Sequence, residues 1–205
     1  MESPRHGRLR RDPPHPGGFD FTLHMRRLAD DMVGRLPRLR HVDLNRVAFS
    51  FSQTRKAVDH GMYAALTPMR FEGGRRHTVR HGRKWTVQRL VDASGQEMLY
   101  LLSFYVPRFL NQGFRHKLTT LAHELWHISP RFDGDLRRFD GRCYAHGASQ
   151  KRYDAQVEQL VDRWLALEPP ASVYDFLRYD FRQLVNRYGK IYGTKISVPK
   201  LIPAE

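Results

Sequence analysis

An apolar, aromatic run followed by an amphipathic helical repeat restricts the possible folds of this chain more than any other feature of its sequence. Residues 97–110 read EMLYLLSFYVPRFL, which is typical of a buried strand, and Pro107 indicates its end or an edge position. A stripe at helical spacing then comprises Leu118, Leu121, Ala122, Leu125 and Ile128. Because both elements need a partner for their apolar faces, we expect an α+β fold in which a small mixed sheet packs on this helix.

Other segments extend this prediction on both sides. Asp20 is suited to cap a helix that ends before a proline, and residues 46–52 alternate between polar and apolar as in a strand. Residues 73–87, GGRRHTVRHGRKWTV, predict an exposed basic hairpin. Additional C-terminal helices are predicted over residues 153–167 and 172–188, with a Pro-Pro pair between them.

The first 18 residues differ from the rest in composition. They combine Arg, Pro and Gly with almost nothing to bury, so we expect residues 1–18 to be a disordered basic arm. Residues 19–205 have the length of a single domain. A hydrophobic fraction of 40% is enough to close one core without disulfides.

Apolar runs and cysteine usage predict a cytoplasmic protein that does not associate with membranes. The longest nearly apolar run, Met98 to Val106, is much shorter than the about 20 residues that cross a bilayer. The Arg-rich N-terminus lacks the apolar run of a signal peptide. Cys143 is the only cysteine, so an internal disulfide does not tie the fold to an oxidising compartment.

The predicted helix at residues 118–128 carries the pattern His-Glu-Leu-Trp-His, an HExxH motif. At 3.6 residues per turn, His123 and His127 lie about 40° apart on one face, so both imidazoles can bind the same cation. Glu124 lies beside the pair, where it can reach a water on that cation without being a ligand. The motif predicts a Zn²⁺ site with Glu124 as general base. A solvated polar helix face is the alternative explanation.

A catalytic zinc ion usually takes three protein ligands, so a third donor must come from outside this helix. We favour His146, because imidazole suits Zn²⁺ and the loop after His127 is long enough to return the chain to the helix. Asp133 could return through a tighter turn, and Asp154 or Glu158 could approach from the next helix. These three carboxylates are the alternatives to His146.

Neighbouring residues are candidates for supporting roles. Asp133 or Asp135 could accept the second ring N–H of a ligand histidine. Thr120 could hydrogen-bond within the site, and Tyr144 or Tyr153 could stabilise a negatively charged oxygen.

On these residues, the segment LTTLAHELWHISPRFDGDLRRFDGRCYAHG resembles the zincin metallopeptidases, in particular uncharacterised HExxH metallopeptidases of bacteria and phages. SprT-like proteases are a more distant comparison. The resemblance, which covers roughly residues 98–154, implies a zincin-like fold and a zinc-dependent endopeptidase whose metal ligands are the three histidines named above. It also implies a protein or peptide substrate that pairs with an edge strand near residues 99–106, and hydrolysis by a metal-activated water with Glu124 as base.

The charge balance supports a different function. Thirty-five Lys and Arg residues against 21 Asp and Glu residues give a net charge of +14, which attracts polyanions. Cations gather in the predicted hairpin at Arg75, Arg76, Arg80, Arg83 and Lys84. The alternative function is therefore a basic nucleic-acid-binding module with a structural or vestigial metal site. A Walker-type phosphate loop, a Gly-x-Ser-x-Gly elbow and zinc-ribbon cysteines are all missing from the sequence, which argues against those classes.

Overall fold

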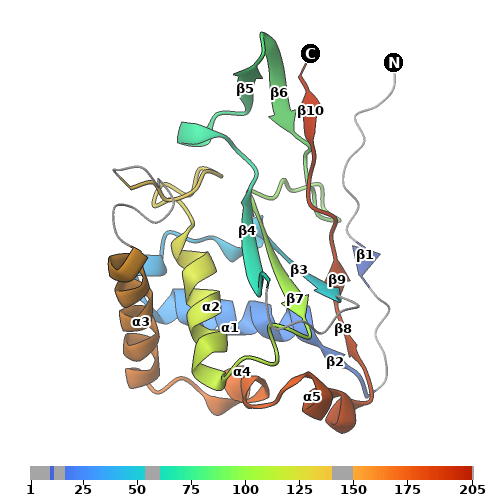
Figure 1. Cartoon of the computed structure of the whole chain (residues 1–205), viewed down its shortest axis with the longest axis vertical. Coiled ribbons are helices and arrows are strands. Elements are labelled where there is room, and N and C mark those ends of the chain that lie inside the picture. Colours follow the sequence, from blue (N-terminus) through green and yellow to red (C-terminus); the bar gives the residue numbers. More distant parts are fainter. Residues whose placement is uncertain (1–9, 12–16, 54–60, 140–149, 205) are drawn as a thin grey trace.

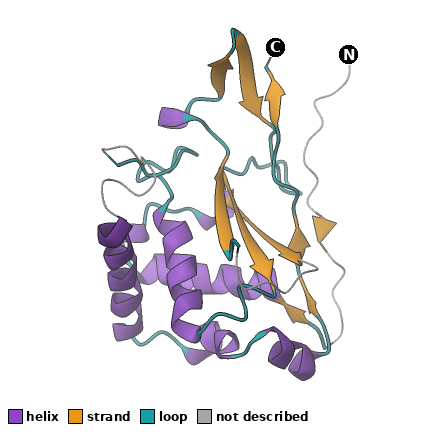
Figure 2. Ribbon diagram, in the orientation of Figure 1, coloured by secondary structure: helices purple, strands orange, loops and turns teal. Residues whose placement is uncertain are grey.

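A computed structural model of the chain describes residues 10–11, 17–53, 61–139 and 150–204. The fold is mixed α+β, as predicted, with several small sheets. The helices are grouped together at one end of the molecule, and a separate small sheet projects at the other end (Figures 1 and 2). In the described part of the chain, none of the helices has the length and apolar character needed to cross a bilayer.

The central sheet has the strand order β3-β7-β4. β3 (Val47–Gln53) runs parallel to β7 (Tyr100–Val106), and β4 (Ala64–Pro68) pairs with β7 in the antiparallel sense. β7 is therefore the middle strand and almost wholly buried, which explains its continuous apolar sequence. The prediction that residues 99–106 form a free edge is wrong. The edge beside the motif helix is β4, which the sequence pattern did not reveal.

Two helices pack against this sheet, α1 (Phe21–Arg35) on β3 and α2 (Phe114–Trp126) on β4. Asp20 caps α1 as predicted, because its carboxylate accepts a hydrogen bond of 3.0 Å from the Leu23 amide. α2 carries the motif and begins one turn before the predicted start. The apolar stripe of α2 lies in the main core, and α3 (Gln150–Ala166) packs against α2.

The prediction of one helix over residues 172–188 is wrong. The chain instead forms α4 (Ala171–Tyr174), the 3-10 turn η4 (Asp175–Arg178) and α5 (Phe181–Tyr188). The break has a local cause, because Asp180 adopts extended backbone angles and forms a capping box that starts α5 as a new helix.

The projecting sheet has the order β10-β6-β5. β5 (His77–Arg80) and β6 (Arg83–Val87) form the predicted basic hairpin, with positive φ at both residues of its His81-Gly82 turn. β10 (Leu201–Pro203) adds a third, antiparallel strand next to β6. This strand was not predicted.

Short strands join the two ends of the chain. β2 (Phe19–Asp20) pairs with β8 (Ile191–Tyr192), and β1 (Arg10–Arg11) pairs with β9 (Thr194–Lys195). β1 belongs to the predicted disordered arm, so two residues of that arm are held by backbone pairing. The other residues up to position 16 lie outside the described part, and the disorder of the arm as a whole stays a prediction.

Lys117 ties the start of α2 to the C-terminal segment. It is 2% exposed, and its Nζ donates to the carbonyls of Leu177 and Tyr179 at 2.9 and 2.7 Å. We expect Lys117→Met to lower the free energy of unfolding by about 2–3 kcal/mol, because two carbonyls lose a charged donor. Urea denaturation measures this loss. The exposed-site control Lys151→Met should change stability by less than about 0.5 kcal/mol, and equal effects of both variants would contradict the role of Lys117.

Candidate metal centre

The two motif histidines converge at the C-terminal end of α2. His123 lies in the last turn, and His127 follows the helix with backbone angles that are still helical. Their Nε2 atoms are 3.0 Å apart. Two nitrogen ligands of a tetrahedral zinc ion lie roughly 3.3 Å apart, so the rings need only a small adjustment to bind one ion. The expectation that both rings reach the same point is met, and their role as metal ligands stays a prediction.

Tyr153 of α3 lies behind the imidazole of His127. Its hydroxyl is 3.2 Å from His127 Nδ1 and 3.3 Å from the carbonyl oxygen of His123. A hydroxyl that donates to this carbonyl can accept a hydrogen bond from Nδ1–H, and this tautomer puts the lone pair of the other ring nitrogen on Nε2, the atom that faces His123. Burial raises the pKa of Tyr153, which keeps the hydroxyl protonated. Tyr153 thus fixes the orientation of the His127 imidazole from the ring atom opposite to Nε2.

Glu124 faces the edge strand β4. It is 8% exposed, and the backbone amide of Leu66 donates a hydrogen bond to its carboxylate. Burial raises the pKa of Glu124 to about 7, although the bond from Leu66 acts in the opposite direction. The carboxyl group is therefore held in one orientation, next to the histidine pair, and is suited to exchange protons near neutral pH.

The hydrogen-bond register of β4 shows which of its groups face outward. Tyr63 accepts a bond from β7, and Met69 donates to the residue just before β7, so odd-numbered positions pair with β7. The backbone N–H and C=O groups of the even-numbered residues then point away from β7, toward the outer edge of the sheet. Ala64 and Leu66 present their amides and carbonyls at this edge, and the described residues add no further strand there. Leu66 directs its amide to Glu124, which places this carboxylate against the edge of β4.

The loop after the motif folds back and fixes the position of His127. The Arg137 amide donates to the His127 carbonyl at 2.6 Å. Tyr100 of β7 donates its hydroxyl to the Asp135 carbonyl at 2.8 Å and accepts the Gly134 amide at 3.0 Å. Gly134 has φ of 86°, which suits glycine at this return of the chain. The returning loop, itself held by Tyr100, therefore fixes the backbone of His127.

Trp126 of the motif forms cation–π contacts with two guanidinium groups. Arg38 lies 4.5 Å and Arg137 3.7 Å from the indole ring centroid, and Arg137 Nε donates to the Trp126 carbonyl at 2.7 Å. Burial lowers the pKa of Arg137 to about 10, so the group remains charged at neutral pH. These cation–π contacts hold the end of α2 in place. The sequence pattern gave no sign of either arginine.

Two of the carboxylates considered as third ligands are engaged elsewhere. Glu158 accepts hydrogen bonds from Arg115 at 2.8 and 3.0 Å and from Thr119 at 3.0 Å, one turn of α2 before the histidine pair. Asp133 forms an ion pair of 3.2 Å with Arg131. Neither carboxylate is brought to the two imidazoles.

Within the described residues, no group of three or more His, Cys, Asp and Glu side chains could hold a metal ion. Asp154 therefore does not complete the histidine pair in this structure either. His146, the favoured third ligand, lies outside the described residues, as do Cys143 and Tyr144. The identity of the third donor stays a prediction.

The structure shows Asp135 and Thr120 in hydrogen bonds with residues other than the two histidines, and their supporting roles stay predictions. The Asp135 carboxylate accepts bonds from Arg138 Nε at 2.8 Å and from the Gly73 amide at 2.9 Å, so it stabilises the loop. Thr120 donates to Gln112 at 3.2 Å. Both side chains are used by local structure, which spacing along the sequence could not show.

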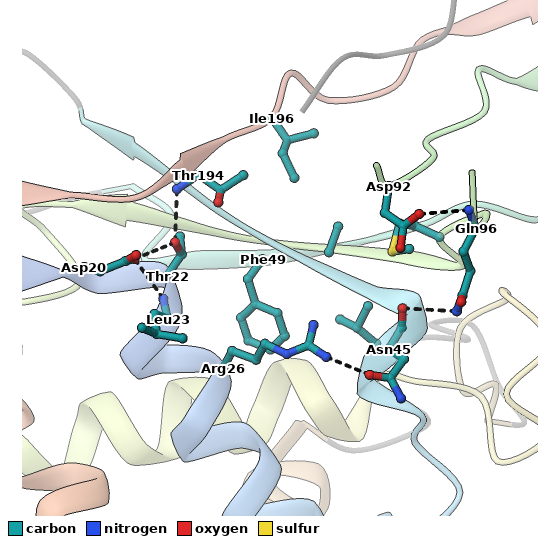
Figure 3. Close-up of a pocket in the computed structure, with 13 residues that line it drawn as sticks. Asp20, Thr22, Leu23, Arg26, Asn45, Phe49, Asp92, Gln96, Thr194 and Ile196 are labelled. Carbon is teal, nitrogen blue, oxygen red and sulfur yellow. Dashed lines mark hydrogen bonds between the residues drawn. The ribbon is translucent and has the colours of Figure 1, made fainter. Parts of the chain in front are cut away.

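A pocket of about 400 Å³ lies beside β3, at the opposite edge of the sheet from β4 (Figure 3). Its polar residues bond to one another: Thr22 donates to Asp20 at 3.1 Å, and Arg26 donates to Asn45 at 3.0 Å. The motif residues are not among those that line it, so we assign it no part in catalysis.

Comparisons with known proteins found no match to the chain among protein-family models, curated proteins or solved structures.

Proposed function

We propose that the protein is a zinc-dependent endopeptidase with a zincin-like arrangement of sheet and motif helix, acting on protein or peptide substrates in the cytoplasm. The observation that carries this proposal is the 3.0 Å separation of the Nε2 atoms of His123 and His127, with Glu124 and the open edge of β4 directly beside them. A solvated polar helix face does not explain this arrangement, because Glu124 and His127 are buried.

The donor set fits zinc. Two imidazoles with converging Nε2 atoms are borderline-soft ligands of the type Zn²⁺ prefers, and Tyr153 holds one of them from behind. His146 is the proposed third ligand, because imidazole suits Zn²⁺ and this residue follows His127 by 19 positions, enough chain to return to the helix.

The chain's own residues account for the proton transfers. Zinc held by these histidines would supply an activated water and a Lewis acid for the substrate carbonyl. Glu124 accepts the proton of the attacking water and returns it to the leaving amine. The bond from Leu66 holds the carboxylate in the orientation that these transfers need, and burial keeps bulk water from competing for it.

The open edge of β4 supports an extended substrate. The carbonyl of Leu66 points outward from the sheet, whereas its amide is already bonded to Glu124 and Ala64 is buried. An extended peptide that pairs with this carbonyl would pass next to Glu124 and the histidines. This proposal replaces the pairing with residues 99–106 that the sequence suggested.

Unfolded casein incubated with the zinc-loaded full-length protein tests the proposed activity. We expect internal cleavage products by mass spectrometry, loss of cleavage after treatment with 1,10-phenanthroline, and recovery after zinc is added back. Cleavage that persists after the metal is stripped would contradict a zinc mechanism.

Tyr153→Phe tests the positioning role of the hydroxyl. Removal of a group that orients a metal ligand typically weakens metal binding about 10–100-fold, and we expect at least a tenfold loss of zinc affinity. Competition with a chromogenic zinc chelator measures it. Tyr179→Phe, which removes a surface hydroxyl bound by Arg187, is the control and should bind zinc like wild type. Equal zinc affinities of the two variants would show that the Tyr153 hydroxyl does not position a zinc ligand.

A further inference from the structure

The sheet β10-β6-β5 carries a charge that the proposed zinc site does not use. Residues 73–89 contain six Arg and Lys residues and no Asp or Glu. The hairpin projects beyond the rest of the molecule, at the end opposite to the helices (Figure 1). Arg80, Arg83 and Lys84 are all exposed at or near its tip. The positive charge is thus concentrated on an extension that solvent and partners can reach.

The strand register gathers arginine and an aromatic ring on one face. Arg80 is paired with Arg83 across the hairpin, and Thr78 is paired with Trp85. Cross-strand partners share a face, and residues two apart on one strand also share it, so Arg80, Arg83 and Trp85 lie together. Like charges directly opposite each other destabilise a hairpin, and the fold alone therefore gives no reason for this pair.

Acidic partners near this sheet are already engaged. Glu97 forms a buried 2.8 Å ion pair with Arg70, and its carboxylate also pairs with Arg89 at 3.3 Å and Arg76 at 3.7 Å. In the part of the chain that the structure describes, no carboxylate forms an ion pair with Arg80, Arg83 or Lys84. The tip of the hairpin is therefore an uncompensated cationic surface.

We propose that the Arg80–Arg83–Trp85 face of this sheet binds nucleic acid, with the two guanidinium groups on backbone phosphates and the half-buried indole against a base. Arginine forms bidentate bonds with phosphate, and an aromatic ring beside it offers a stacking surface. A membrane is disfavoured because the tip, Arg-His-Gly-Arg, has no apolar side chain to insert, and the exposed Val79 lies on the opposite face. This inference goes beyond the proposed peptidase and does not depend on it.

The test is fluorescence anisotropy of labelled 20-nucleotide single-stranded and duplex DNA, titrated with the full-length protein at several salt concentrations. The double variant Arg80→Gln/Arg83→Gln should bind at least about tenfold more weakly at moderate salt. The slope of log affinity against log salt should fall by roughly 1.4 for the single strand or 1.8 for the duplex, because two phosphate contacts are lost.

The matched control is Arg163→Gln/Arg182→Gln, which removes the same charge from exposed positions on α3 and α5. The control should keep most of the wild-type affinity. Equal losses in both double variants would show an effect of net charge alone and overturn the proposal. Binding that does not depend on salt, or selective binding of phosphatidylserine vesicles with no binding of DNA, would overturn it as well. Circular dichroism of both variants verifies that they are folded.

Discussion

Replacing Glu124 by Gln should nearly abolish peptide hydrolysis while zinc stays bound. The amide oxygen can still accept the hydrogen bond from Leu66, but the side chain can no longer take a proton from water. General acid–base groups contribute about 10²–10⁴-fold to rate, and we expect kcat to fall by a factor in that range. Initial rates on casein, together with the zinc content of the purified variant, measure the two effects separately.

Glu158→Gln is the matched control for this variant. Glu158 lies on α3 and bonds to Arg115 and Thr119, away from the histidine pair. We expect it to keep both wild-type activity and zinc. A Glu124→Gln variant that hydrolyses casein at half the wild-type rate would exclude Glu124 as the base. Loss of zinc from Glu158→Gln would instead identify Glu158 as a ligand that moves when the metal binds.

His127→Ala should remove zinc from the protein. Its Nε2 is one of the two nitrogens that converge among the described residues, and its loss leaves His123 without the partner at 3.0 Å. We expect affinity to fall more than about a hundredfold, beyond the 10–100-fold loss expected for a positioning group such as Tyr153. Isothermal titration of the metal-free protein with zinc measures the affinity and the stoichiometry.

The control for the histidine variant is on the same helix. His116 is exposed and lies nearly two turns before His123, so His116→Ala tests whether any histidine of α2 contributes. It should bind one equivalent of zinc as wild type does. Retention of tight zinc binding by His127→Ala would show that zinc binds elsewhere in the protein.

The helical period was enough to predict the convergence of His123 and His127, because it depends only on spacing within one helix. The sheet was harder to predict. Pro107 suggested an edge for the strand that became β7, yet β7 lies between a parallel and an antiparallel partner that are distant in sequence. The real edge strand, AALTP, is only five residues long and does not alternate between apolar and polar residues, so it shows no strand pattern. Strand order is set by such long-range pairing.

The positioning groups could not be read from local patterns either. Tyr153 occupied an ordinary apolar position in a helical repeat, and its contact with His127 arises only where α3 packs on α2. Arg137 was one of many arginines in a loop. The break before α5 was different, because Asp180 and Gln183 form a capping box whose spacing is visible in the sequence.

A crystal structure of the full-length protein grown with zinc, with anomalous diffraction recorded at the zinc edge, tests the central claim most directly. We predict one strong peak about 2.0–2.1 Å from the Nε2 atoms of both His123 and His127, with a third protein donor beside them. An anomalous map with no peak between the two rings, in crystals that contain zinc, would contradict it.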